Sequence, residues 1–156
     1  HFRINDNLDA LSHATCAMAI DVDAKGIVVC SVSGKTARLI SRFRSPVDII
    51  GMTTNPKVWH KLGLSWGVTP VLSEEFPNMD VMFYFAKKAT ADALDLNKGD
   101  NVIITGGPVS RGGGNTNTIK IEQIDKSAPE NFRSPGWLFL RFSVCGLEEK
   151  INIFPI

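Results

Sequence analysis

The sequence predicts an α/β fold, a three-layer sandwich around a mostly parallel sheet of about five strands with an edge strand at the end. Three observations predict it. Short apolar runs of strand length alternate with segments of helical periodicity along most of the chain. The earlier runs are apolar throughout, which is typical of strands buried on both faces of a parallel sheet. The last run alternates apolar and polar residues, which is typical of an edge strand with one wet face.

The first half of the chain opens with an amphipathic helix. Residues 7–20 repeat apolar residues every three or four positions, and this stripe should pack on the sheet. The stripe consists of Leu8, Leu11, Ala14, Thr15, Met18 and Ala19. Residues 25–31 contain the run GIVVCS, which is too short for a helix and predicts a buried strand. A helix over residues 36–43 and a second strand over residues 48–53 follow.

A start signal marks the third helix. Asn55 precedes Pro56, and a capping residue followed by proline is a common beginning of a helix, which we expect to run over residues 56–65. The pattern then predicts a strand, a helix, a strand and the edge strand over residues 68–72, 80–94, 101–105 and 118–124, respectively.

Composition predicts one soluble globular domain that binds neither nucleic acid nor a membrane. The chain has 156 residues, of which 44% are hydrophobic, and its 17 basic and 16 acidic residues leave a net charge of +1. The protein has no large excess of positive or negative charge that would attract it to nucleic acid or to a membrane. The sequence has no apolar run of spanning length and no signal peptide, so we expect a cytoplasmic location.

The cysteines and histidines do not predict a metal site. They are scattered along the chain as Cys16, Cys30, Cys145, His1, His13 and His60. We interpret the cysteines as small buried or reduced thiols rather than a disulfide or zinc site, and the histidines as surface or helix-face residues. Since the sequence also lacks a Ser/His/Asp, Cys/His or paired-carboxylate arrangement, it predicts no catalytic residue in this chain.

The tripeptide GKT at residues 34–36 raises the question of a nucleotide phosphate loop. A Walker loop requires glycine five residues before Gly34, but that position is Val29, inside a predicted strand. What remains is a tight turn between a strand and a helix. Such a turn attracts phosphate, because the first N–H groups of a helix have no internal partner and the helix dipole favours an anion there. The candidate residues are Ser31, Val32, Ser33, Gly34, Lys35 and Thr36.

Two interpretations of this turn stay open from spacing alone. The hydroxyl groups of Ser31, Ser33 and Thr36 donate to phosphate oxygens, with Lys35 or Arg38 adding charge. Alternatively, Ser33 and Thr36 only cap the helix, a role in which serine and threonine are common.

A glycine-rich loop between the last two strands is a second candidate. Its predicted binding residues are Gly107, Arg111, Gly112, Gly113, Gly114 and Asn115. A loop of this length and composition is costly to order unless a ligand orders it. If the last strand neighbours the first, the loop lies across the same end of the sheet as the turn, where Arg111 and Lys35 converge on one anion. The alternative is a plain flexible hairpin.

Several separated blocks of the sequence together resemble the C-terminal domain of pyruvate kinase. They are SHATCAMAI, AKGIVVCSVSGKTARLISRFR, PVDIIGMTTNPKVWHKLGLSWGVTPVL, LNKGDNVIITGG and GNTNTIKIE, within about residues 8–122. The resemblance implies an α/β sandwich of about five strands that carries the allosteric site of a tetramer. The family's phosphate-holding loop falls on residues 31–36 and its closing loop on residues 107–115.

The resemblance implies a regulatory domain that binds a phosphorylated sugar or nucleotide effector and contacts the pyruvate kinase barrel and neighbouring subunits. Phosphoryl transfer from phosphoenolpyruvate to ADP, a glycolytic step, belongs to that barrel together with its magnesium and potassium. The chain begins with His1 and lacks the barrel, so we expect a fragment or excised domain that is inactive alone and carries no cofactor. The alternatives are a stand-alone phosphometabolite-binding protein or enzyme, and a purely structural interface domain.

The sequence departs from the family in two places. Members that bind a fructose bisphosphate use a tryptophan and an arginine in the segment that corresponds to residues 76–97, which has neither. The tryptophan and arginine hold the second phosphate in those members, and Lys87 and Lys88 either replace them or form the solvated face of a helix. A monophosphate effector is therefore at least as credible as a bisphosphate. The family-like domain covers residues 1–124, and residues 125–156 are a tail unlike the family, which either packs on the sheet or a partner or is foreign sequence.

Overall fold

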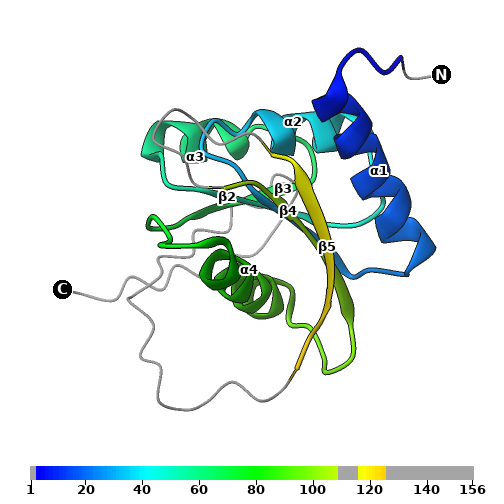
Figure 1. The fold of residues 1–156 in the computed structure, drawn as a ribbon, viewed down its shortest axis with the longest axis vertical. Helices are drawn as coiled ribbons and strands as arrows, with labels where there is room; N and C mark the ends of the chain where they lie inside the picture. Colours follow the sequence, from blue (N-terminus) through cyan, green and yellow to red (C-terminus); the bar gives the residue numbers. More distant parts are fainter. Residues whose placement is uncertain (1–2, 109–115, 126–156) are drawn as a thin grey trace, which may run out of the picture.

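The computed structural model describes residues 3–108 and 116–125, which form an α/β sandwich (Figure 1). In chain order the elements are α1 (Asn7–Asp21), β1 (Gly26–Cys30), α2 (Lys35–Arg42), β2 (Ile49–Thr53), α3 (Pro56–Leu62), β3 (Val68–Leu72), α4 (Met79–Leu94), β4 (Asn101–Gly106) and β5 (Thr118–Gln123). The predicted elements are all present. Their ends differ by a few residues, most at α3, which stops at Leu62 before Gly63 instead of continuing to Ser65.

The sheet has the order β3-β2-β1-β4-β5. Its first four strands are parallel, and β5 lies antiparallel to β4 at one edge, which confirms the mostly parallel sheet and the edge strand. The condition that the last strand neighbours the first is wrong, because β4 lies between β5 and β1. The chain reverses after β4 through a hairpin, and a hairpin places its two strands side by side.

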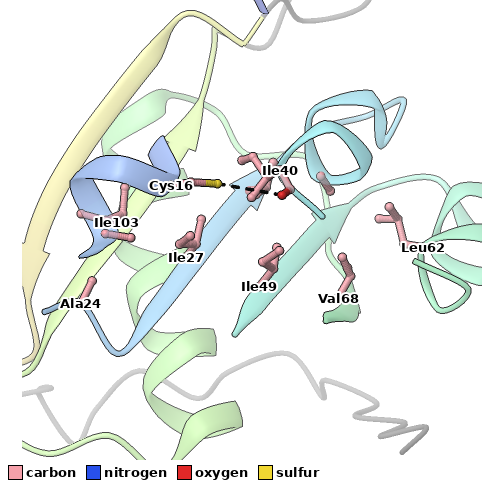
Figure 2. Close-up of a cluster of buried hydrophobic side chains, with 11 residues drawn as sticks. Cys16, Ala24, Ile27, Ile40, Ile49, Leu62, Val68 and Ile103 are labelled. Carbon is pink, nitrogen blue, oxygen red and sulfur yellow. Dashed lines mark hydrogen bonds between the residues drawn. The ribbon is translucent and has the colours of Figure 1, made fainter. Parts of the chain in front are cut away.

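Each of the four parallel strands β1 to β4 contributes to two separate cores. Helices α1, α2 and α3 cover one face of the sheet and α4 covers the other (Figure 1). Successive side chains of a strand point to opposite faces, so Ile27 lies in the core under α1 to α3 while Val28 lies in the core under α4. Figure 2 shows Ile27, Ile49 and Ile103 from three strands in the first core. This double burial explains why the strands read as continuous apolar runs.

The buried face of α1 differs from the predicted stripe. Its buried residues are Asp9, Ser12, Thr15, Cys16 and Ala19. Of the predicted stripe, only Thr15 and Ala19 are buried; Ala14 is exposed, and Leu8, Leu11 and Met18 are half-buried. The physical reason is that the hydroxyls of Ser12 and Thr15 donate to the carbonyls of Leu8 and Leu11, so these small polar side chains are satisfied inside the helix and pack closely.

The cysteines and histidines among the described residues agree with the interpretation of the sequence. Cys16 and Cys30 are free thiols, and burial raises the pKa of Cys16 to about 11 and that of Cys30 to about 12. Figure 2 shows the Cys16 thiol directed at the carbonyl of Ile40, with an Sγ to oxygen distance of 3.9 Å. His13 and His60 are exposed. His1, Cys145 and the tail beyond residue 125 lie outside the described residues.

Candidate anion-binding site

The predicted turn forms at the carboxyl end of β1. The strand ends at Cys30, and α2 begins at Lys35 after Gly34, which is its N-cap. Gly34 has a φ of 69°, a left-handed conformation that glycine adopts without strain. A Cβ at this position would lie 2.7 Å from a Val58 methyl carbon, so glycine also allows α3 to pack against the turn.

Two serine hydroxyls of the turn accept hydrogen bonds from its backbone. Ser31 Oγ accepts a hydrogen bond from the Gly34 N–H at 3.1 Å, and Ser33 Oγ accepts one from the Lys35 N–H at 3.3 Å. Each hydroxyl therefore keeps its own proton for an external acceptor. Neither Ser33 nor Thr36 is the N-cap of α2, because the N-cap is Gly34 and no side chain forms a cap hydrogen bond there. The Ser33 hydroxyl accepts from the Lys35 N–H, and the Thr36 hydroxyl bonds to that of Thr116.

The start of α2 leaves backbone donors unused. The N–H groups of Thr36 and Ala37 have no hydrogen-bond acceptor among the described residues, and the first intrahelical acceptor is the Gly34 carbonyl, which binds the Arg38 N–H. Such donors, with a helix dipole equivalent to about half a positive charge, favour an anion.

Thr53 supports the turn from the neighbouring strand and was missed in the sequence. Its hydroxyl donates to the Val32 carbonyl at 3.1 Å and accepts from the Asn55 N–H at 3.2 Å. Thr53 is 2% exposed, so this contact is fixed within the fold. The available signal was a polar residue at the end of a buried apolar strand, adjacent to the strand that carries the turn.

The charge near the turn comes from Lys35, which is exposed. Its Nζ lies 3.9 Å from an Asp6 carboxylate oxygen, and both side chains are more than half exposed. The Asp6 carboxylate competes with an anion for this ammonium group, a relation that the sequence did not indicate. Val32 and Arg38 are exposed beside it.

The glycine-rich loop begins at the same end of the sheet as the turn, the end formed by the carboxyl ends of the parallel strands. Because β4 pairs in parallel with β1, Gly107 follows the carboxyl end of the strand beside the turn, and the Asn117 N–H donates to the Gly106 carbonyl at 3.0 Å across the base of the loop. Thr116 then reaches the turn directly, with its Oγ1 2.8 Å from Thr36 Oγ1. The structure therefore brings residues 31–36, Gly107 and Thr116 together. The other predicted loop residues, Arg111, Gly112, Gly113, Gly114 and Asn115, lie outside the described residues.

Lys87 does not belong to this site. Its Nζ contacts Asp125 at 3.0 Å and Glu122 at 3.5 Å, so it joins α4 to the end of β5. Burial acts to lower the pKa of Lys87, but the hydrogen bond to Asp125 and the charge of Glu122 outweigh it and raise the pKa. Lys87 is therefore a partly buried cation held by two carboxylates and does not form a freely solvated face. Lys88, also half-buried, has no ion pair among the described residues.

The residues that the structure describes hold neither a cluster of metal ligands nor a membrane-spanning helix. No group of three or more histidine, cysteine, aspartate or glutamate side chains is arranged to hold a metal ion. No helix in this part of the chain is long and apolar enough to span a membrane.

Fold and site together define a class of protein, an α/β domain whose strand ends present a hydroxyl-lined turn at a helix N-terminus, suited to an anion. Comparison with known proteins gives the family. Residues 9–122 match the family model described as pyruvate kinase, alpha/beta domain. The chain belongs to the pyruvate kinase family, and the matched residues are the α/β domain of that enzyme.

Individual relatives agree with this assignment. The chain is similar to the pyruvate kinase of Lactococcus lactis subsp. lactis, with 40% identity over 115 residues, which is 74% of this chain and 22% of the relative. It is 32% identical over 117 residues to the pyruvate kinase of Clostridium acetobutylicum, covering 75% of this chain and 25% of the relative. It is 34% identical over 116 residues to that of Lactobacillus delbrueckii subsp. bulgaricus, covering 74% of this chain and 20% of the relative. The chain thus spans a quarter or less of these relatives.

Proposed function

We propose that this domain binds a phosphorylated sugar or nucleotide at the turn of residues 31–36 and thereby regulates a pyruvate kinase. The observation that carries the proposal is the set of unused donors at one point of the fold. Two serine hydroxyls retain their protons, and the Thr36 and Ala37 N–H groups have no acceptor among the described residues. A phosphate group offers several oxygens that accept only, which matches this set.

In this proposal the site binds one phosphate group. The Lys87 side chain is occupied by Asp125 and Glu122 at the α4 side of β5, so it does not supply a second phosphate clamp. We therefore expect no large preference for a bisphosphate over a monophosphate. A magnesium or potassium requirement belongs, in this proposal, to the catalytic part of the full-length protein.

Calorimetry of a charge variant tests the effector site. Fructose 1,6-bisphosphate, ribose 5-phosphate and AMP are titrated against the wild type and Ser33→Glu, which adds a carboxylate at an exposed position of the turn. We expect the wild type to bind at least one ligand and the variant to lose most of that affinity through like-charge repulsion. Asn97→Glu is the matched control. It adds the same charge at an exposed residue near the amino end of β4, whereas the turn lies at the carboxyl ends of the strands. Binding by none of the three ligands, or equal binding by wild type and Ser33→Glu, would exclude the site.

Assembly is a second proposed function, favoured by exposed apolar residues. Ile20 on α1 is 57% exposed and Ile121 on the edge strand β5 is 46% exposed. Exposed apolar side chains, and a sheet edge with which no described strand pairs, favour contact with another chain. In this proposal the domain contacts the barrel and neighbouring subunits of a cytoplasmic tetramer. Sedimentation velocity of the wild type and Ile121→Lys tests it: a wild type that stays monomeric at high concentration would count against self-association.

Phosphoryl transfer from phosphoenolpyruvate to ADP is proposed for the full-length protein, with this domain in a regulatory role. The purified chain should therefore show no turnover with phosphoenolpyruvate, ADP, magnesium and potassium, measured after contaminating host enzyme has been removed. Turnover that copurifies with the chain would favour the alternative of a stand-alone enzyme.

A further inference from the structure

We propose that Thr116 is a positioning residue of the anion site, whose hydroxyl donates to Thr36 Oγ1 so that the Thr36 proton is directed at the bound phosphate. The inference rests on the proposed function and names a residue that the sequence did not indicate. It starts from one contact, the 2.8 Å distance between the two hydroxyl oxygens, which joins residues 80 positions apart in the chain.

Burial restricts the partners that Thr36 can use. Thr36 is 2% exposed and lies in the first turn of α2, next to the unused N–H groups of that turn. Its hydroxyl therefore meets protein groups or a ligand at the turn, with little access to bulk water. Thr116 is fixed in turn, because the next residue, Asn117, donates its N–H to the Gly106 carbonyl at the base of the β4–β5 connection.

The neighbouring hydroxyls of this strand are engaged elsewhere. Thr118 Oγ1 donates to the Asn117 side chain at 2.9 Å, and Thr105 Oγ1 donates to the Thr118 carbonyl at 3.0 Å. Within residues 116–118, Thr116 is thus the residue whose hydroxyl reaches α2.

The direction of the hydrogen bond between Thr36 and Thr116 decides whether the Thr36 hydroxyl can donate to a bound anion. Each hydroxyl has one proton, and in the Thr36–Thr116 pair either oxygen can be the donor. If Thr36 donates to Thr116, it presents only lone pairs toward the site, which repel an oxyanion. If Thr116 donates, Thr36 keeps its proton for the anion. A phosphate oxygen accepts only, so its binding selects the second arrangement.

We call this pair of hydrogen bonds, from Thr116 to Thr36 and from Thr36 to the phosphate, the relay. The first bond also strengthens the second. A hydroxyl that accepts a hydrogen bond becomes a better donor, because chains of hydrogen bonds polarise one another. The ligand class that benefits is a fully ionised phosphate monoester. A neutral sugar hydroxyl, which both donates and accepts, gains less, since it pairs with either arrangement of the two threonines.

Isosteric variants test the relay by calorimetry with ribose 5-phosphate and inorganic phosphate as probes. Thr116→Val keeps the shape and removes the hydroxyl, and we expect about three- to tenfold weaker binding, the value of one hydrogen bond. Thr116→Ser retains the hydroxyl and should restore affinity to within about twofold of the wild type. Thr118→Val is the matched control, because its hydroxyl contacts only the Asn117 side chain among the described residues.

A double-mutant cycle shows whether Thr116 acts through Thr36. The variant Thr36→Val with Thr116→Val should bind no more weakly than Thr36→Val alone, because the relay has already lost its donor. Additive losses, equal affinities of the wild type and Thr116→Val, or a Thr116→Ser variant as weak as Thr116→Val would each overturn the relay while leaving the anion site in place. A wild type that binds neither these probes nor fructose 1,6-bisphosphate nor AMP would overturn both proposals.

Discussion

At the scale of single residues, two glycines with the same backbone conformation lie in different surroundings. Gly34 has a φ of 69° and Gly67 a φ of 66°, so an alanine at either position adopts the strained left-handed conformation. A Cβ at Gly67 meets no atom within 4 Å, whereas one at Gly34 would lie 2.7 Å from Val58 Cγ1. The pair therefore separates the conformational cost of the turn from the packing of α3 against it.

Comparing Gly34→Ala with Gly67→Ala measures that packing. We expect Gly67→Ala to lower the free energy of unfolding by about 1–2 kcal/mol, the cost of a left-handed alanine. Gly34→Ala should lower it by about 1–3 kcal/mol more, because Val58 must move. Urea unfolding of both variants gives the difference. Equal losses would show that α3 yields without cost, and the close packing of the turn would then lack energetic importance.

A second residue-scale prediction concerns Asp6, whose carboxylate lies 3.9 Å from Lys35 Nζ. Asp6→Asn removes the charge but retains a side-chain oxygen that caps α1 as Asp6 now does for the Asp9 N–H. The variant should bind ribose 5-phosphate more tightly, by less than about fivefold, because the pair is exposed and screened. The gain should shrink as salt is raised from low ionic strength. An unchanged affinity at low salt would show that Lys35 does not contribute charge to the site.

At the scale of elements, a buried carboxylate of α1 connects the first two helices. Asp9, 3% exposed, accepts a hydrogen bond from Arg42 Nη2 at 2.6 Å and others from the backbone and side chain of Asn5. The hydrogen bond from Arg42 lowers the pKa of Asp9, and burial opposes this only in part. The start of α1 is thus tied to the last turn of the helix that carries the anion site.

This ion pair predicts a pH dependence of stability. Because the pKa of Asp9 is lower in the folded state than in the unfolded chain, its contribution is full above the unfolded pKa of about 4 and is lost as the pH falls through the folded-state pKa. Asp9→Asn should therefore unfold at a lower temperature than the wild type at pH 7, and the difference should narrow below pH 4. Asp21→Asn, at an exposed residue at the far end of α1, is the control. A difference that stays constant from pH 7 to pH 3 would contradict the role of the charge.

At the scale of the whole molecule, the described residues contain a complete sandwich. Both cores draw on β1, β2 and β4, and the helices of both faces precede the edge strand β5. At the opposite edge, Pro70 in β3 has no N–H to offer, and its carbonyl accepts from Trp59 Nε1 at 3.1 Å. Pro70 thus disfavours extension of the sheet at β3, whereas no described strand pairs with the outer edge of β5.

Removal of residues 126–156 tests whether this sandwich is sufficient. We expect the chain of residues 1–125, which retains the contact of Lys87 with Asp125, to unfold in one cooperative transition at an unchanged midpoint. Calorimetric scans of both chains make the comparison. A broad transition or a markedly lower midpoint after truncation would assign part of the core to the removed segment.

The sequence by itself determined the elements and their class, because the period of apolar residues is a local property of the chain. Residues 26–30 are apolar at every position and so had to be covered on both faces, and the fold covers them with α1 to α3 on one side and α4 on the other. The glycine and hydroxyl residues of the turn likewise indicated a helix N-terminus suited to phosphate. The blocks that resemble pyruvate kinase gave the family.

Only the tertiary structure decided which residues from distant segments meet. The contacts of Thr53 with Val32, of Asp9 with Arg42 and of Thr116 with Thr36 depend on strand order and helix placement, which no local pattern encodes. The buried face of α1 was mispredicted in part for the same reason, because Asp9 is buried where the fold supplies Arg42 as its partner. The Ser12 and Thr15 hydroxyls are instead satisfied by carbonyls within α1 itself. Apolar periodicity reflects the cost of exposing a side chain to water, whereas the burial of a charged group such as Asp9 depends on a partner, Arg42, that only the folded chain brings to it.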